Sequence, residues 1–240
     1  MEKDKQLKIL ELFCGTKSFS KVAEERGHQV YSVDINKKFN PDLCIDVSKL
    51  TSELIIELFG KPDVIWASPP CTEYSHAKRV GVRKIKEANA IVGKTLQLIQ
   101  ELEPQFWILE NPQTGLLKQQ SFMVDLPFTD ASYCKYGMPY RKQTRLWNNL
   151  DLNLKTCKKD CKFMNGKKHI GSAGNGRKKY TDKSYKLTEK YVVPKELCLT
   201  IIKKIEDKLN TTELGIPPKP KVLGILPNFI WIRKIFYSIF

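Results

Sequence analysis

Residues 63–71 read DVIWASPPC and contain the transition that decides the fold. The first five, 63–67, are mostly β-branched or aromatic, which is the pattern of a short strand buried on both faces. Pro69 and Pro70 end that strand, since proline lacks the backbone N–H that a sheet requires. Cys71 therefore follows a stiff, extended turn at the end of a buried strand.

Strand-like and helix-like segments alternate on both sides of this turn. Short apolar runs predict strands, and longer segments with apolar residues every three or four positions predict helices. This alternation implies βαβ units and an α/β fold with a mostly parallel, doubly wound sheet. The expected strands are 7–13, 29–35, 43–47, 63–67 and 105–109, and the expected helices are 18–26, 48–59, 84–103 and 194–209.

Polar residues come at or directly after the ends of several expected strands. In a parallel sheet the carboxyl ends of the strands meet at one edge, where ligands bind. The sequence therefore predicts one ligand-binding edge. The residues placed there are Asp34, Asp46, Ser68–Cys71, Glu110 and Asn111.

The composition fits a soluble globular protein with an excess of positive charge. The 240 residues are 41% hydrophobic and 28% charged, which excludes disordered, collagen-like and polytopic membrane classes. A net charge of +15 fits a nucleic-acid partner, and also a generally basic protein. Residues 135–190 hold 16 Lys and Arg against four Asp and Glu, so +12 of the +15 lies in one segment.

The cysteine content and the N-terminus predict an intracellular protein that is not secreted and has reduced thiols. There are seven cysteines, an odd number, and the first residues are charged and lack an apolar signal core. Cys157, Cys161 and His169 are zinc-ligand residue types, but a fourth ligand is missing and the spacing matches no strong zinc pattern. We therefore expect loop cysteines and no bound metal.

Cys71 and Glu110 are the residues best placed for catalysis. A cysteine on rigid backbone at a ligand-binding edge suits a nucleophile, although buried cysteines in general are more often structural. A carboxyl group at the end of the next strand can act as a general acid in a desolvated site, or it can simply cap a helix. Only the catalytic interpretation explains why both residues occur at neighbouring strand ends.

Gly15 and Asp34 are typical of a nucleotide-binding edge. Gly15 lies in the loop after the first expected strand, and Asp34 ends the second strand about 20 residues later, where a ribose-binding acid is usual. A single loop glycine is weak evidence on its own, and Asp34 also fits a strand-end turn.

Taken in order, these motifs resemble the DNA cytosine-5 methyltransferase family, especially its short phage- or virus-type members. The resemblance covers about residues 7–147. Five stretches of this sequence match motifs of the family. They are Leu12–Gly15 with Phe19 for the cofactor loop, Val33-Asp34 for the ribose acid, Pro70-Cys71-x-x-x-Ser75 for the nucleophile, Ile108–Pro112 for the Glu-Asn motif, and Tyr136–Pro139 for the start of the arginine motif.

The resemblance implies a Rossmann-like class I methyltransferase fold that uses S-adenosylmethionine (SAM), with a small basic target-recognition insert. The expected partner is duplex DNA with a flipped cytosine: Cys71 adds to C6 while Glu110 protonates or hydrogen-bonds N3, and C5 then attacks the SAM methyl group. By the same resemblance, the catalytic residues are Cys71, Glu110, Arg141 and Arg145, the cofactor contacts are Phe13, Gly15, Asp34, Ile35, Asp46 and Pro69, and the substrate contacts are Ser75, Asn111 and Tyr136.

The sequence departs from the family pattern at three places. Lys17 stands where the family has a second glycine, the arginines of 140–145 (YRKQTR) are shifted, and the C-terminal Gly-Asn motif is matched only by Gly174-Asn175 in a basic loop. Two alternatives follow, an RNA (tRNA-type) cytosine-5 methyltransferase and a catalytically weak DNA-binding relative. Amino-methyltransferases carry an aromatic residue at the position of Cys71, so the cysteine favours C5 chemistry.

We expect four regions and a monomer, with restriction–modification as the setting. They are a SAM-binding catalytic domain (1–148), a short basic target-recognition region (149–190), a helix returning to the catalytic domain (191–210), and a proline-rich linker with an apolar tail (211–240). The longest uncharged run of the 222–240 tail has 11 residues, fewer than the about 20 that span a bilayer. This tail fits a membrane-surface anchor, a docking segment for a protein partner, or packing on its own domain.

Overall fold

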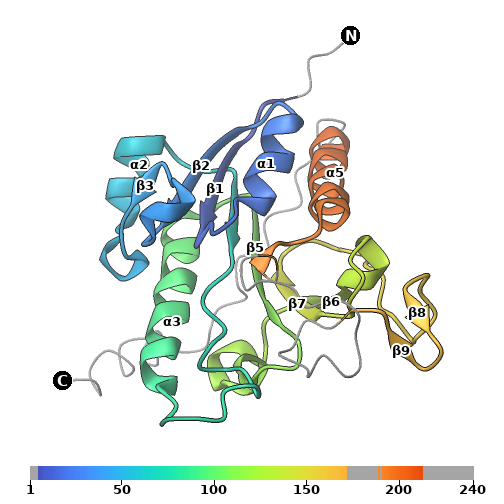
Figure 1. Ribbon diagram of the computed structural model, residues 1–240. Coiled ribbons are helices and arrows are strands. Elements are labelled where there is room, and N and C mark those ends of the chain that lie inside the picture. Colours follow the sequence, from blue (N-terminus) through green and yellow to red (C-terminus); the bar gives the residue numbers. More distant parts are fainter. Residues whose placement is uncertain (1–4, 172–188, 190, 213–240) are drawn as a thin grey trace.

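The computed structural model describes residues 5–171, 189 and 191–212, which build a seven-stranded sheet with helices on both faces (Figure 1). The strand order is β3-β2-β1-β4-β5-β7-β6, and β7 alone runs against the others. The strands are β1 (Lys8–Leu12), β2 (Gln29–Asp34), β3 (Leu43–Cys44), β4 (Val64–Ala67), β5 (Phe106–Pro112), β6 (Phe128–Ser132) and β7 (Gln143–Asn148).

Two hydrophobic cores lie on opposite faces of this sheet. Helices α1 (Ser18–Glu25) and α5 (Lys195–Thr212) cover one face, and α2 (Ser52–Phe59) and α3 (Ile85–Leu102) cover the other (Figure 1). Alternate residues of each strand enter different cores, since successive side chains point to opposite faces. In β4, for example, Trp66 packs with α1, where it stacks on Phe19 at 4.5 Å between ring centroids, a contact worth about 1 kcal/mol beyond its buried area.

The predicted alternation of strands and helices is confirmed, with two local differences. Helix α2 begins at Ser52 rather than 48, because Thr51 caps it by accepting the Leu54 N–H at 3.2 Å, and Val47–Lys49 instead forms the 3₁₀ helix η2. Strand β5 continues to Pro112, so Glu110 and Asn111 lie within the strand rather than after it. The continuation is held by β7, which pairs along β5 and which sequence periodicity did not reveal.

Helix α5 returns the chain to the sheet beside α1. The Glu206 carboxylate accepts from Arg26 at 2.7 Å and contacts His28 Nε2 at 3.1 Å, and the Val193 N–H donates to Ser18 Oγ at 3.1 Å. These contacts join residues that are about 175 positions apart, so they close the α1 face of the fold. The helix ends at Thr212, two residues into the expected linker.

A small irregular region connects β7 to α5. In its described part, residues 149–171, the strands are β8 (Met164–Asn165) and β9 (Lys168–His169), which pair with each other and lie apart from the main sheet, beyond β6 (Figure 1). The glycine-rich stretch with Gly174-Asn175, most of the 211–221 segment and the 222–240 tail lie outside the described residues. Among the helices that the structure does describe, none has the length and apolar character needed to cross a membrane.

Candidate active site

Cys71 is held at the end of β4, next to the end of β5. The two strands are parallel neighbours, with Ala67 opposite Leu109. Asn111 ties the turn to β5, because its Nδ2 donates to the Pro69 carbonyl at 2.9 Å and its side chain is 1% exposed. The prolines and this buried hydrogen bond fix the backbone from which Cys71 projects.

Glu110 lies in the same region as a buried carboxylate with three polar neighbours. Its side chain is on the α1–α5 face of the sheet, two residues after Ile108 in that core. Its Oε1 accepts from the Tyr133 hydroxyl at 3.2 Å and from the Thr144 hydroxyl, and Lys142 Nζ lies 3.9 Å away. Burial and the charge of Glu110 keep the pKa of the Tyr133 hydroxyl well above its ordinary value, so Tyr133 stays protonated and acts as the donor.

The charges of Glu110 and Lys142 both affect the pKa of the Cys71 thiol. Burial is the largest cause that raises the pKa of the Cys71 thiol, and the Glu110 carboxylate raises it further, whereas Lys142 lowers it. The sulfur is therefore within electrostatic reach of an acid and a cation that act in opposite directions. The thiolate is disfavoured in the protein alone and depends on Lys142 for compensation.

Ser75 forms hydrogen bonds within the segment that follows Cys71. Its Oγ accepts the Ala77 N–H at 3.1 Å, and its carbonyl accepts from Arg83 Nη1 at 2.8 Å. The Glu73 carboxylate binds Lys78 Nζ at 2.6 Å and the Lys84 N–H at 2.7 Å. This network orders the chain between Cys71 and the start of α3.

The predicted cofactor loop is organised around Asp34 at the end of β2. One carboxylate oxygen accepts the Gly15 N–H at 2.9 Å and the other accepts the Asn36 N–H at 2.8 Å. Gly15 has φ of +46°, and a Cβ built on it would meet nothing closer than the Phe13 carbonyl at 3.9 Å. The space above the Gly15 backbone is open, so a ligand can approach it closely.

Phe13 and Lys17 also adopt left-handed backbone conformations, with φ of 57° and 55°. Lys17 occupies the position where the family has glycine, and its left-handed conformation is the one that favours glycine there. Lys17 gives α1 no side-chain cap. The buried Glu11 of β1 does so instead, because its carboxylate accepts both the N–H and the hydroxyl of Ser20 in the first turn.

Three other predicted cofactor residues lie at the same end of the strands. Ile35 follows Asp34 and is 67% exposed, an unusual degree for a large apolar side chain. Asp46 caps η2 by accepting the Ser48 N–H at 2.9 Å. Pro69 is buried beneath the turn that carries Cys71.

The two predicted arginines do not join Glu110. Arg145 follows Thr144 in β7 and therefore points to the opposite face, where its guanidinium forms a two-point ion pair with Asp130 at 2.7 and 2.8 Å and lies over the Phe128 ring. The structure therefore places Arg145, which the resemblance gives as a catalytic residue, apart from Glu110. Arg141 lies in the preceding loop, half-buried, and its Nε has no hydrogen-bond partner among the described residues.

Sequence reasoning missed Lys142, Tyr133 and Thr144, which surround Glu110. Lys142 stands between the two arginines that drew attention, and its Nζ lies 3.5 Å from the Tyr133 hydroxyl and over the Tyr133 ring. The alternation of side chains in β7 identifies Thr144, but only once β7 is known to pair with β5. Tyr136, expected at the substrate, is buried, and its hydroxyl accepts the Lys155 N–H at 2.7 Å.

Sequence comparison places this site in a known family. Residues 7–123 match the model of the C-5 cytosine-specific DNA methylases. A protein of Frog virus 3 (isolate Goorha) named "Probable DNA (cytosine-5)-methyltransferase" is 32% identical over 177 residues, which cover 66% of this chain and 79% of the viral protein.

One solved structure shares the architecture. The Entamoeba histolytica methyltransferase EhMeth superimposes with a TM-score of 0.50 at 14% identity, covering 85% of this chain and 99% of EhMeth. A candidate DNA modification methyltransferase encoded within an E. coli prophage gives a TM-score of 0.49 at 23% identity, covering 62% of this chain. The chain spans about half the length of that prophage protein, 49%.

The sheet order, the reversed β7 and the polar edge define a Rossmann-like class I methyltransferase fold. The family match and the viral relative then identify the chain as a member of the C-5 cytosine-specific DNA methylase family.

Proposed function

We propose that this protein transfers a methyl group from SAM to C5 of cytosine in DNA, with Cys71 as the covalent nucleophile. The observation that carries the proposal is that Cys71 and Glu110 lie at the ends of adjacent parallel strands, with Lys142 3.9 Å from Glu110 and both charges acting on the Cys71 thiol. The family membership supports the same reaction. A structural cysteine gains nothing from a buried carboxylate and an ammonium group held beside it.

The residues at the β1 and β2 ends fit SAM. The open space above Gly15 admits a ligand close to the backbone, and each Asp34 oxygen accepts one N–H in the structure and keeps capacity for another donor, such as a ribose hydroxyl. Exposed Ile35 offers an apolar surface for a flat ring. SAM, when bound, supplies an electrophilic methyl group.

Cys71 opens the reaction by adding to the cytosine ring. The thiolate forms a bond to C6, and Glu110 donates a proton or a hydrogen bond to N3, so the ring electrons collect at C5. C5 then takes up the methyl group and later loses its proton to a base, which expels Cys71 and restores the aromatic ring. The cytosine must leave the duplex to reach this buried position, so base flipping is part of the proposal.

Lys142 takes the electrostatic role that the resemblance assigned to an arginine. Its Nζ lies 3.9 Å from Glu110 and lowers the pKa of the Cys71 thiol. We expect it to favour the thiolate and to balance the carboxylate when the base enters. The 149–171 segment lies beyond β6, at the β7–β6 end of the sheet, and its exposed lysines would attract DNA phosphates.

Methyl transfer from labelled SAM to duplex DNA by the full chain tests the proposal. We expect 5-methylcytosine in the DNA product, mapped by bisulfite sequencing, with none formed by Cys71→Ser. Transfer RNA in a parallel reaction separates the RNA alternative. Equal methylation by wild type and Cys71→Ser, or transfer to tRNA with none to DNA, contradicts the proposal.

A further inference from the structure

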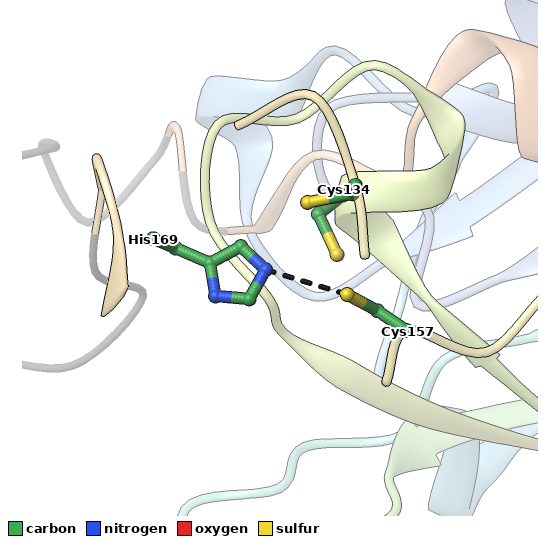
Figure 2. A group of neighbouring side chains, drawn as sticks. Cys134, Cys157 and His169 are labelled. Carbon is green, nitrogen blue, oxygen red and sulfur yellow. Dashed lines mark hydrogen bonds between the residues drawn. The ribbon is translucent and has the colours of Figure 1, made fainter. Parts of the chain in front are cut away.

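Four side chains outside the catalytic group converge beside the small β8–β9 pair. They are Cys134, Cys157, Cys161 and His169, and their sulfur and nitrogen atoms all lie within 4.8 Å of one another. Figure 2 shows the sulfur of Cys157 directed at the His169 ring, with Cys134 beside them, and Cys157 Sγ lies 3.5 Å from His169 Nε2. The sequence shows no fourth ligand close to Cys157, Cys161 and His169, and the fold supplies one in Cys134.

We propose that these four residues bind a structural zinc ion. Three thiolates and one imidazole are a complete ligand set for tetrahedral zinc, with no position left for water. The trio of Cys157, Cys161 and His169 failed as a sequence pattern because Cys134 comes from a separate segment, η5 (Tyr133–Tyr136). We designate these four residues the Cys₃His cluster.

The distances in the Cys₃His cluster suit zinc. Zinc–sulfur bonds of about 2.3 Å and a zinc–nitrogen bond of about 2.0 Å in a tetrahedron separate two sulfurs by about 3.8 Å and a sulfur from a nitrogen by about 3.5 Å. The Cys157–His169 separation of 3.5 Å equals the second value. The upper limit of 4.8 Å for every pair leaves at most about 1 Å to close between two sulfurs and at most about 1.3 Å between a sulfur and the nitrogen.

Backbone contacts bring the ligands together without the ion. The Cys157 N–H donates to Ser132 Oγ at 3.0 Å, which fixes Cys157 against the end of β6, just before η5. Lys159 has φ of 68°, so the chain turns sharply between Cys157 and Cys161. Lys135, next to Cys134, pairs with Asp160 at 2.8 Å and so links the two ligand-bearing segments a second time.

The β8–β9 pair beside the Cys₃His cluster contributes no buried side chain of its own, since all four of its residues are exposed or half-buried. Strands β8 and β9 have two residues each, and such a short pair is not stable alone. Ile170, the residue after His169, is 42% exposed rather than buried. A metal ion supplies the stability that an apolar core would otherwise give to such a small unit.

The same ion would fix the basic segment relative to the active site. Cys134 directly follows Tyr133, whose hydroxyl donates to Glu110 at 3.2 Å. Cys157, Cys161 and His169 are interspersed with exposed lysines, namely Lys158, Lys159, Lys162, Lys167 and Lys168. If DNA is the substrate, as proposed above, zinc would hold these cations at a set distance from Glu110 and Cys71.

Metal analysis of the full chain, purified without chelator under reducing conditions, tests the site. We expect about one zinc ion per chain, and cobalt substitution should give the absorption bands of a tetrahedral thiolate site. Iron in place of zinc, or a folded, metal-free chain that binds neither zinc nor cobalt, overturns the proposal. A disulfide between two of the cysteines in the metal-free protein overturns it as well.

Variants connect the metal to these ligands. Cys134→Ser and Cys161→Ser should lower zinc affinity by more than about 100-fold in competition with a chelator, whereas His169→Cys should retain zinc in a four-thiolate site. Cys44→Ser is the matched control, because Cys44 is exposed on β3 at the far edge of the sheet. Zinc retained by Cys134→Ser, or lost from Cys44→Ser, overturns the assignment.

Hydrogen exchange of the wild-type protein tests the site without any variant, so the test stays valid if a variant fails to fold. Removing zinc from the wild type should speed exchange in peptides covering 157–169 and leave those of β1 and β4 unchanged, and zinc should reverse the effect. Unchanged exchange at 157–169 overturns the structural role. Neither this readout nor zinc content requires methyl transfer, so failure of the zinc site is distinguishable from failure of the proposed reaction.

Discussion

Cys71 and the Cys₃His cluster show two ways in which one protein uses cysteine. Cys71 stands on a single rigid turn, where a carboxylate and an ammonium group act on its thiol. Cys134, Cys157 and Cys161 come from two separate segments, and the groups nearest to them are each other and His169. A single thiol influenced by a carboxylate and an ammonium group fits covalent chemistry, whereas a closed set of four ligand atoms fits a metal.

The two sites also differ in how they are built. The prolines before Cys71 and the Asn111–Pro69 hydrogen bond fix the backbone at Cys71 through two neighbouring strands. The cluster depends on contacts between β6 and the irregular segment that follows β7, such as Cys157 to Ser132. We therefore expect changes at Cys71 to affect chemistry with little effect on stability, and changes in the cluster to do the reverse.

The largest expected effect is that of Cys71→Ser. Serine is nearly the same size but is a far weaker nucleophile near neutral pH, so methyl transfer should fall by more than about 10³-fold. Zinc content and the melting temperature should stay at the wild-type values. A Cys71→Ser protein that loses zinc or unfolds would remove the distinction between the two sites.

Glu110→Gln should lower methyl transfer by about 10²–10⁴-fold, the range for a general acid. The same substitution should make the Cys71 thiol more reactive, because loss of the Glu110 charge removes one cause of the raised pKa of Cys71. Iodoacetamide should then alkylate Cys71 faster at neutral pH, measured by peptide mass spectrometry. Alkylation of exposed Cys44 is the internal control, and slower alkylation of Cys71 would contradict the electrostatic account.

Lys142→Met should produce a smaller loss, about 10- to 100-fold, because one charge interaction disappears while the nucleophile and the acid remain. Lys142 lowers the pKa of Cys71, so its loss should raise that pKa and slow alkylation. The rise of activity with pH should then be shifted to more alkaline values. Lys142→Arg keeps the charge and should retain most activity, and equal losses in both variants would contradict this role.

The last prediction concerns stability and not activity, through Glu11, a buried acid outside both sites. Burial raises its pKa to about 7, so its protonated form is favoured in the folded protein. The stability it contributes is full below about pH 4.5 and is lost as the pH rises through about 7, at most about 3 kcal/mol. Glu11→Gln should flatten this decline in melting temperature, and an unchanged pH profile would show that Glu11 titrates normally.

The sequence was enough to predict the parallel half of the fold, and it placed the two residues that we propose as catalytic at the ends of neighbouring strands. Strands β1, β2, β4 and β5 each contain a short run of mostly apolar residues, Cys71 comes shortly after the run in β4, and Glu110 directly follows the run in β5. That information is local, so one stretch of chain is sufficient to reveal it.

What the sequence did not predict depends on long-range pairing. Strand β7 carries polar residues on both faces and pairs with β5 residues that lie 32 to 40 positions earlier in the chain, so its periodicity did not show that Thr144 faces Glu110. The same pairing directs Arg145 away to Asp130. Cys134 lies 23 residues before Cys157, too far for a spacing pattern to identify it as the fourth ligand.

Covalent trapping tests the central claim most directly. Duplex DNA with 5-fluorocytosine at the target base blocks the final elimination, because the fluorine at C5 cannot leave as a proton. With SAM and the full chain, we predict a complex that survives denaturant and whose modified peptide carries the base on Cys71. Failure of the wild type to form this complex on a DNA that it methylates, or a cytosine bound to any other cysteine, would contradict the account.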